Sequence, residues 1–255
     1  MTTRVWGQST EKKLKWVTLS AKYLPGALTV MRNSFIINES VCKAIGLAQS
    51  DKATRQFENL VRLIAEDGVS VVAIEMESDT VVGAALNKIQ VKGDPNCAGF
   101  LDNQMKAPDL DPAYKELLNF MIQMENKVDI FEHYGVTKLL DHMFLSTHID
   151  YYERGIAHGL VAATVAMARA LQRGEDVAVP ISDNKYPWKN ISTPPVQAVI
   201  SLFTSPISQK IGKSLGWNEM YIVRYDQLFY RGESYASKLD KNCQTTVYMS
   251  IKIDN

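Results

Sequence analysis

One segment of the sequence has the residue types and spacing of an anion-binding turn. The strand expected at 139–149 leads through a turn with Gly155 into an apolar helical pattern that starts at Ile156 and includes Gly159. The first turn of such a helix has unpaired backbone N–H groups at the positive end of the helix dipole, and this combination binds phosphate groups. A second interpretation stays open at this point, an ordinary strand-to-helix connection in which the glycine permits a tight turn.

The sequence lacks the other common motifs for phosphate or metal binding. Neither GxxxxGK[ST], GxGxxG nor HExxH occurs, and the 4 histidines are scattered. We therefore predict no bound metal. The 3 cysteines, Cys42, Cys97 and Cys243, have no CxxC spacing and are expected to be small core residues with free thiols, as is typical of a reducing compartment.

The turn resembles the coenzyme A loop of the GNAT superfamily of acyl-CoA-dependent N-acyltransferases. There a strand of the type LSVHPDYRGRGIG enters a pyrophosphate loop described as [Q/R]xxGx[G/A], and residues 155–157 match its second half. Tyr152 stands where Gln or Arg is usual, and Glu153 where Gly is common. The resemblance implies that the strand and the loop amides bind acetyl-CoA. The implied cofactor-binding residues are Leu145, Ser146, Thr147, Arg154, Gly155, Ile156, Ala157, His158 and Gly159.

Three further segments resemble one branch of this superfamily, the insect arylalkylamine N-acetyltransferases, which include dopamine N-acetyltransferase. Residues 35–47, FIINESVCKAIGL, are similar to the branch's FxxDEPLNxxLGL motif. Residues 128–134, VDIFEHY, resemble the helix before its cofactor strand. Residues 201–211, SLFTSPISQKI, together with LGW at 215–217, match its TSxYSxxI…LGF segment. The motifs occur in the branch's order and span most of the chain.

The resemblance implies that Glu39 is the general base. A primary amine, with a pKa of about 10, is protonated at neutral pH, and only its neutral form attacks a thioester. In the branch the motif's glutamate accepts this proton directly or through water. Asn38 and Ser40 replace the Asp and Pro that flank it. Without the resemblance, Glu39 would be interpreted as a solvated glutamate at a helix end.

Thr204 and Ser208 occupy the two hydroxyl positions that the branch uses around the amine and the leaving thiolate. A hydroxyl there hydrogen-bonds the thioester oxygen or passes a proton to the coenzyme A sulfur. Ser205 and Pro206 also have the pattern of a helix N-cap and first turn, in which Ser208 would satisfy the helix end. The two roles are compatible. Ile207 replaces an aromatic residue that is common in the motif.

The implied activity is acetyl transfer from acetyl-CoA to a small arylalkylamine of the dopamine, tyramine, tryptamine or serotonin type. The amine attacks directly, with no covalent enzyme intermediate. Two alternatives stay open. One is an N-acyltransferase for agmatine or a polyamine, or one that uses longer acyl-CoA donors. The other is a non-catalytic protein that binds coenzyme A, suggested by the departures at Asn38, Ser40, Tyr152 and Glu153.

Hydrophobic periodicity predicts the elements that position these residues. The expected helices cover 26–47 with a break near Asn38, 52–67, 112 towards 135, 156 to near 174, and 206–215. The expected strands cover 69–76 and 81–89 as a hairpin, 139–149, 196–203, 221–225 and 245–253. Residues 92–111 and 175–195, rich in Gly, Pro and polar residues, are expected to be loops.

This order favours a mixed α/β (α+β) domain that spans residues 1–255. The resemblance implies the GNAT fold, in which helices flank a mixed, mostly antiparallel sheet with a splayed acetyl-CoA-binding cleft.

Composition excludes several classes of partner. The 255 residues contain 28 Lys plus Arg and 28 Asp plus Glu, so no excess charge favours nucleic acid or an anionic membrane. No apolar stretch approaches the roughly 20 residues needed to cross a bilayer, and residues 1–25 contain no export signal. We expect a cytoplasmic monomer whose partners are a small amine and acetyl-CoA.

Overall fold

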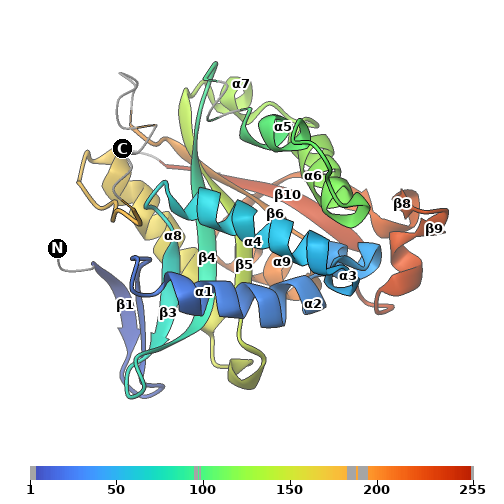
Figure 1. The fold of residues 1–255 in the computed structure, drawn as a ribbon. Coiled ribbons are helices and arrows are strands. Elements are labelled where there is room, and N and C mark those ends of the chain that lie inside the picture. The colour runs from blue at the N-terminus through green and yellow to red at the C-terminus, as the bar shows by residue number, and fades with distance from the viewer. Residues whose placement is uncertain (1–3, 95–96, 98, 183–187, 189–194, 254–255) are drawn as a thin grey trace.

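The computed structural model describes residues 4–94, 97, 99–182, 188 and 195–253. Its main feature is an 8-stranded sheet in the order β1-β2-β3-β4-β5-β6-β10-β7 (Figure 1). These strands are β1 (Val5–Ser9), β2 (Leu14–Thr18), β3 (Val71–Glu75), β4 (Thr80–Val91), β5 (Lys138–Thr147), β6 (Ala198–Phe203), β7 (Asn218–Arg224) and β10 (Thr245–Lys252). Neighbouring strands are antiparallel except β5 and β6, which are parallel. The predicted mixed, mostly antiparallel sheet flanked by helices is confirmed.

Helices cover both faces of this sheet. They are α1 (Leu24–Val30), α2 (Ile36–Asn38), α3 (Ser40–Ile45), α4 (Asp51–Ala65), α5 (Phe100–Met105), α6 (Pro112–Glu125), α7 (Ile130–Tyr134), α8 (Ile156–Gln172) and α9 (Pro206–Ser214), and a π-helical turn, η1 (Met31–Phe35), joins α1 to α2. On one face, where Figure 1 shows α1 and α4, the core includes Phe35, Phe57 and Phe144. On the other face α8 packs with Leu160 and Val161 against strand residues such as Val71.

Strands β5 and β6 separate part of the way along the sheet. Their register contains two pairs, Leu140 with Val199 and Asp141 with Ile200, although β5 continues to Thr147 and β6 to Phe203. At the point of separation the Ser201 hydroxyl donates to the His142 carbonyl (2.9 Å), and the register between β4 and β5 shifts by one residue after Leu86. The last part of β5 therefore has a backbone edge that does not pair with β6.

Two acidic side chains lie beside this point, Asp141, which is buried, and Glu125, which is half-buried. Asp141, 3% exposed, accepts a hydrogen bond from Gln90 Nε2 (2.6 Å), and Gln90 and Glu125 of α6 both line a small cavity between β4 and the α5–α6 pair. Burial raises the pKa of Asp141 to about 7. Burial and the nearby Asp141 charge raise the pKa of Glu125 as well. The fold therefore favours protonated carboxyls here, because neither charge is well solvated.

Some expectations from the sequence need correction. The hairpin of β1 and β2 was not predicted, and neither were the two-residue strands β8 (Phe229–Tyr230) and β9 (Glu233–Ser234). The loop predicted at 92–111 contains helix α5. Of the loop predicted at 175–195, residues 183–187 and 189–194 lie outside the described part. The helix predicted from 112 towards 135 is divided into α6 and α7, because the chain turns after Glu125 and Asp129 caps a new helix. The other predicted helices and strands occur with boundaries shifted by a few residues.

Candidate functional site

The turn after β5 has the backbone form of an anion-binding loop. After a 3₁₀ turn at Ile149–Tyr151 the chain passes through two residues with positive φ, Glu153 (64°) and Gly155 (76°), and α8 then begins at Ile156. No side chain caps the start of α8. Its first amides are thus left for solvent or for a ligand. Glu153 is exposed, and its positive φ lies in the region that glycine, the usual residue of the family motif here, adopts without strain.

The N-terminal turn of α8 is fixed against the sheet by Trp16 of β2. The indole Nε1 donates to the Ile156 carbonyl (3.2 Å). A Cβ on Gly159 would lie only 2.2–2.5 Å from indole atoms, so this position requires glycine. The Gly159 amide already donates to the Gly155 carbonyl (3.0 Å). Gly159, a predicted cofactor residue, thus contributes tight packing that holds the turn in place.

The end of β5 presents main-chain groups to the open side of the sheet. The His148 amide donates to Val82 of β4 (2.9 Å), and successive residues of a strand direct their N–H and C=O groups to opposite sides. Leu145 and Thr147 therefore direct theirs away from β4, whereas Ser146 pairs with Ala84. Of the three predicted strand residues, Leu145 and Thr147 have main-chain groups free to bind an extended ligand.

Charged residues connect this turn to neighbouring segments. Lys12 Nζ donates to the Arg154 carbonyl (3.2 Å), and the Arg154 guanidinium lies 4.7 Å from the Tyr151 ring centroid. At the end of β3, the Ser78 hydroxyl donates to Glu75 (2.5 Å) and lowers the pKa of that carboxyl, with smaller contributions from Tyr151 and from the Arg154 charge. The turn after β5 thus lies near the β3–β4 turn.

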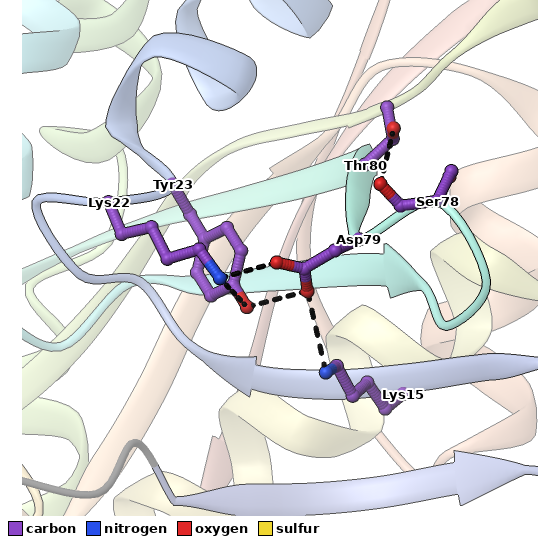
Figure 2. A network of polar contacts seen from close by, with 6 residues as sticks. All are labelled: Lys15, Lys22, Tyr23, Ser78, Asp79 and Thr80. Atoms are coloured by element: carbon purple, nitrogen blue, oxygen red, sulfur yellow. Dashed lines mark hydrogen bonds and ion pairs between the residues drawn. The ribbon is translucent and has the colours of Figure 1, made fainter.

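Ion pairs and a hydrogen bond also link the β3–β4 turn to the start of α1 (Figure 2). Asp79 pairs with Lys22, accepts a hydrogen bond from the Tyr23 hydroxyl (2.9 Å) and lies 3.6 Å from Lys15 Nζ. The hydrogen bond from Lys22 holds the pKa of Asp79 below its usual value. The network thus holds the start of α1, from which the chain continues through η1 and α2 to Glu39.

Glu39 lies at a break between two helices, as the sequence predicted. Its backbone is extended (φ −64°, ψ 139°), and its carboxylate caps α3 by accepting from the amides of Val41 (3.0 Å) and Cys42 (2.7 Å). The preceding π-helical turn is a rare element that occurs frequently at functional sites. The cap forms although Asn38 and Ser40 replace the Asp and Pro of the family motif.

Thr204 meets Glu39 across 165 residues of sequence. It follows the last residue of β6, and its hydroxyl donates to Glu39 Oε1 at 2.5 Å. Because the hydroxyl proton takes part in this bond, the lone pairs of Thr204 Oγ1 can still accept a hydrogen bond from a ligand. Phe35, four residues before Glu39, packs against Phe144 of β5 with ring centroids 5.2 Å apart. The Glu39–Thr204 pair therefore lies beside the part of the sheet where β5 and β6 separate.

Ser208 takes part in a capping box at the start of α9. Its amide donates to Ser205 Oγ (3.1 Å), and its hydroxyl donates to the Ser205 carbonyl (3.0 Å) and lies 3.1 Å from the Ser205 amide. The predicted N-cap is confirmed. The catalytic role of Ser208 stays a prediction, since no hydrogen bond between its hydroxyl and the Glu39–Thr204 pair occurs in the described structure.

Two residues beside this pair were not predicted as site residues. Tyr225, 0% exposed, donates its hydroxyl to the Thr204 carbonyl (2.6 Å). Cys243 was expected in the core, but it is half-buried, with Sγ 3.2 Å from Ser40 Oγ and 3.6 Å from the Thr204 carbonyl. Burial raises the pKa of both groups, and the Glu39 charge adds to this, so both stay protonated donors at neutral pH. No local sequence pattern signals these contacts.

No group of three or more His, Cys, Asp or Glu side chains among the described residues could hold a metal ion. Within the same part of the chain, no helix is both long enough and apolar enough to span a membrane.

The cofactor turn gives a testable expectation at Gly155. Gly155 and Gly174, at the two ends of α8, both have positive φ (76° and 74°), so an alanine at either position costs about 1 kcal/mol of folding free energy. We expect Gly155→Ala to weaken acetyl-CoA binding as well, by about fivefold in Kd, because the new methyl disturbs the amides of the turn. Calorimetric titration measures this Kd. Equal affinities of the Gly155→Ala and Gly174→Ala variants would contradict a role of the turn in binding.

The chain was compared with known proteins. No protein-family profile matches it, and no curated protein matches it in sequence. Among solved structures, arylalkylamine N-acetyltransferase 2 from Aedes aegypti is similar with a TM-score of 0.75 and 20% identity, over 94% of this chain and 99% of that one. The polyamine N-acetyltransferase of Drosophila melanogaster, described as forming N-acetylagmatine, is similar with a TM-score of 0.67 and 12% identity, over 94% and 100% of the two chains.

A third similar structure is a complex with AcCoA. A GNAT superfamily phosphinothricin acetyltransferase from Sinorhizobium meliloti, in complex with AcCoA, has a TM-score of 0.50 and 13% identity, over 94% of this chain and 89% of that one. This protein thus has the GNAT fold in the form found in insect arylalkylamine N-acetyltransferases.

Proposed function

We propose that this protein is an N-acetyltransferase that moves an acetyl group from acetyl-CoA to a small amine. The observation that carries the proposal is the 2.5 Å contact between Thr204 Oγ1 and Glu39 Oε1 beside the open end of β5. It places a proton acceptor and a hydroxyl oxygen, from segments far apart in sequence, where the fold separates two strands. Such an arrangement suits acceptance of a proton from a substrate amine.

The residues around the unpaired end of β5 fit a coenzyme A thioester. The uncapped amides from Arg154 to His158 suit its pyrophosphate, and the free main-chain groups of Leu145 and Thr147 suit its amide-containing arm. Ile156 is buried and would take part through its amide alone. This assignment retains the residues implied by the sequence, with Gly159 and Ser146 in supporting positions.

The chemical step requires proton removal from the amine before attack. The substrate ammonium gives a proton to the Glu39 carboxylate while an N–H donates to Thr204 Oγ1. The neutral nitrogen then attacks the thioester carbonyl carbon, the C–N bond forms and the C–S bond breaks. After C–N bond formation the nitrogen is positively charged and loses a second proton. The departing thiolate gains a proton and leaves as coenzyme A; Ser208 is our candidate for the relay that gives this proton to the sulfur and takes the one lost by the nitrogen, while the proton on Glu39 passes to solvent. No enzyme residue is acylated.

We infer an arylalkylamine as the acceptor, because exposed apolar side chains lie close in sequence to both members of the catalytic pair. Ile37, two residues before Glu39, is 50% exposed, and Ile207, three residues after Thr204, is 74% exposed. Apolar groups at these positions suit the ring of tyramine or tryptamine better than a second cationic group. The alternative acceptor, agmatine or a polyamine, is supported by the similarity in fold between this chain and the Drosophila enzyme.

Initial rates over a panel of amines test the acceptor. We expect tyramine, dopamine, tryptamine and serotonin to be acetylated with a kcat/KM at least tenfold above that of agmatine or spermidine. The reverse order would favour the cationic alternative, and higher rates with longer acyl-CoA donors would favour a different acyl group. A cytoplasmic location, a monomeric state and a single domain over residues 1–255 belong to the same proposal.

A further inference from the structure

We propose that Tyr225 is a positioning residue for the reaction, acting by holding the Thr204 peptide so that its hydroxyl reaches Glu39. The inference rests on the proposed function. Tyr225 lies outside every segment in which the sequence predicted a functional residue. Its hydroxyl donates to the Thr204 carbonyl at 2.6 Å, and its ring is 0% exposed.

Thr204 needs such a contact because regular pairing ends just before it. The register of β6 with β10 ends at Phe203, opposite Val247, and α9 begins at Pro206 after the Ser205 cap. The Thr204 carbonyl is instead bound by two side chains, the Tyr225 hydroxyl and, at 3.6 Å, the Cys243 thiol. A rotation of this peptide would move Thr204 Oγ1 away from Glu39.

Tyr225 is itself held firmly. It follows β7 directly, and its amide donates to the Gln244 carbonyl (2.9 Å). Its ring stacks with that of Tyr235 at a centroid distance of 6.4 Å and an interplanar angle of 24°. The Tyr235 hydroxyl donates to Glu116 Oε1 (2.7 Å). The C-terminal segment is thus anchored to α6 on one side and to the catalytic pair on the other.

The two tyrosines form a matched pair for an experiment. Both are buried, at 0% and 2% exposure, and each hydroxyl makes one short hydrogen bond. Of these two tyrosine hydroxyls, only that of Tyr225 is hydrogen-bonded to Thr204. Tyr225→Phe and Tyr235→Phe therefore remove the same group from adjacent rings, while Phe keeps the stacking and the packing.

We expect Tyr225→Phe to lower kcat about tenfold and to leave the KM for acetyl-CoA within twofold, because small displacements of a positioned group slow the chemical step. The pH of half-maximal kcat should also move, since the contact between Thr204 and Glu39 loosens. Tyr235→Phe should keep both the kcat and the pH profile of the wild type. Thermal melting of both variants reports the loss of stability that they share.

A double-mutant cycle gives the decisive comparison. If Tyr225 acts through Thr204, Tyr225→Phe should have little further effect on kcat in a Thr204→Ala background. Equal kcat values and equal pH profiles for the two phenylalanine variants would overturn the inference, as would additive effects in the cycle. If Tyr225→Phe does not fold, Cys243→Ala removes the other donor to Thr204, and we expect a smaller drop in kcat with the same shift in pH profile.

Failure of this inference can be distinguished from failure of the proposed function. If the wild type acetylates no amine, the function fails before any variant is compared. If the wild type is active and Tyr225→Phe behaves like Tyr235→Phe, the function stands and the positioning role fails.

Discussion

Glu39→Gln is expected to lower kcat/KM for acetyl transfer by roughly a hundredfold to ten-thousandfold, the range that general base catalysis contributes. Gln keeps the size of the side chain and an oxygen that can accept one of the bonds from Val41, Cys42 and Thr204. It cannot take a proton from an ammonium group. The rate of the variant should recover partly at high pH, where more of the amine is neutral in solution. Initial rates from pH 6 to 10 measure this.

A second capping carboxylate provides the control for Glu39→Gln. Asp129 caps α7 by accepting from the Glu132 amide (3.0 Å), outside the proposed site. Asp129→Asn removes the same charge and should keep both its stability and its activity close to those of the wild type, because Asn caps a helix about as well as Asp. Calorimetry should show that Glu39→Gln still binds acetyl-CoA. A Glu39→Gln rate equal to that of the wild type at every pH would remove Glu39 from the mechanism.

Asp141→Asn is expected to make the protein more stable than the wild type above pH 7. The pKa of Asp141 is about 7 in the folded protein and about 4 in an unfolded chain, so between these values the folded state binds the extra proton. The free energy of unfolding of the wild type should fall by about 1.4 kcal/mol per pH unit over this window from this group alone. Asparagine does not titrate and can still accept from Gln90.

Urea unfolding at pH 5 and pH 8 tests this expectation. The stability advantage of Asp141→Asn should be larger at pH 8, because Asp141 is then ionised in the folded wild type. Asp109→Asn, at a side chain that is 86% exposed, should follow the wild type at both values. Parallel pH dependences of Asp141→Asn and the wild type would show that this carboxyl does not stay protonated in the folded protein.

The fold was predictable where a local sequence pattern indicates the element. The break at Glu39 follows from the polar Asn38-Glu39-Ser40 sequence between two apolar helical patterns, and the capping box at Ser205 from Ser205-Pro206. Helix α5 was missed because six residues form a stable helix only through packing, here of the buried Leu101. Strand β1 was missed because its five side chains are exposed or half-buried and give no apolar alternation.

The site was less predictable than the fold, because contacts between distant segments complete it. Cys243 and Ser40 are 203 residues apart, and no spacing between them signals a contact. Gly159 matched a cofactor motif, yet the structure requires glycine there because the indole of Trp16 leaves no room for a side chain. A motif identifies which residue stands at a position, whereas the reason for a glycine there depends on what packs against it.

The most direct test of the proposed acetyl transfer is the release of free coenzyme A from acetyl-CoA by the purified wild-type protein in the presence of tyramine or tryptamine. We predict release that requires the amine, with one N-acetylamine formed for each coenzyme A, as measured by thiol titration and mass spectrometry. No amine-dependent release, from a protein that binds acetyl-CoA in calorimetry, would contradict the proposed acetyl transfer and favour a non-catalytic coenzyme A-binding protein.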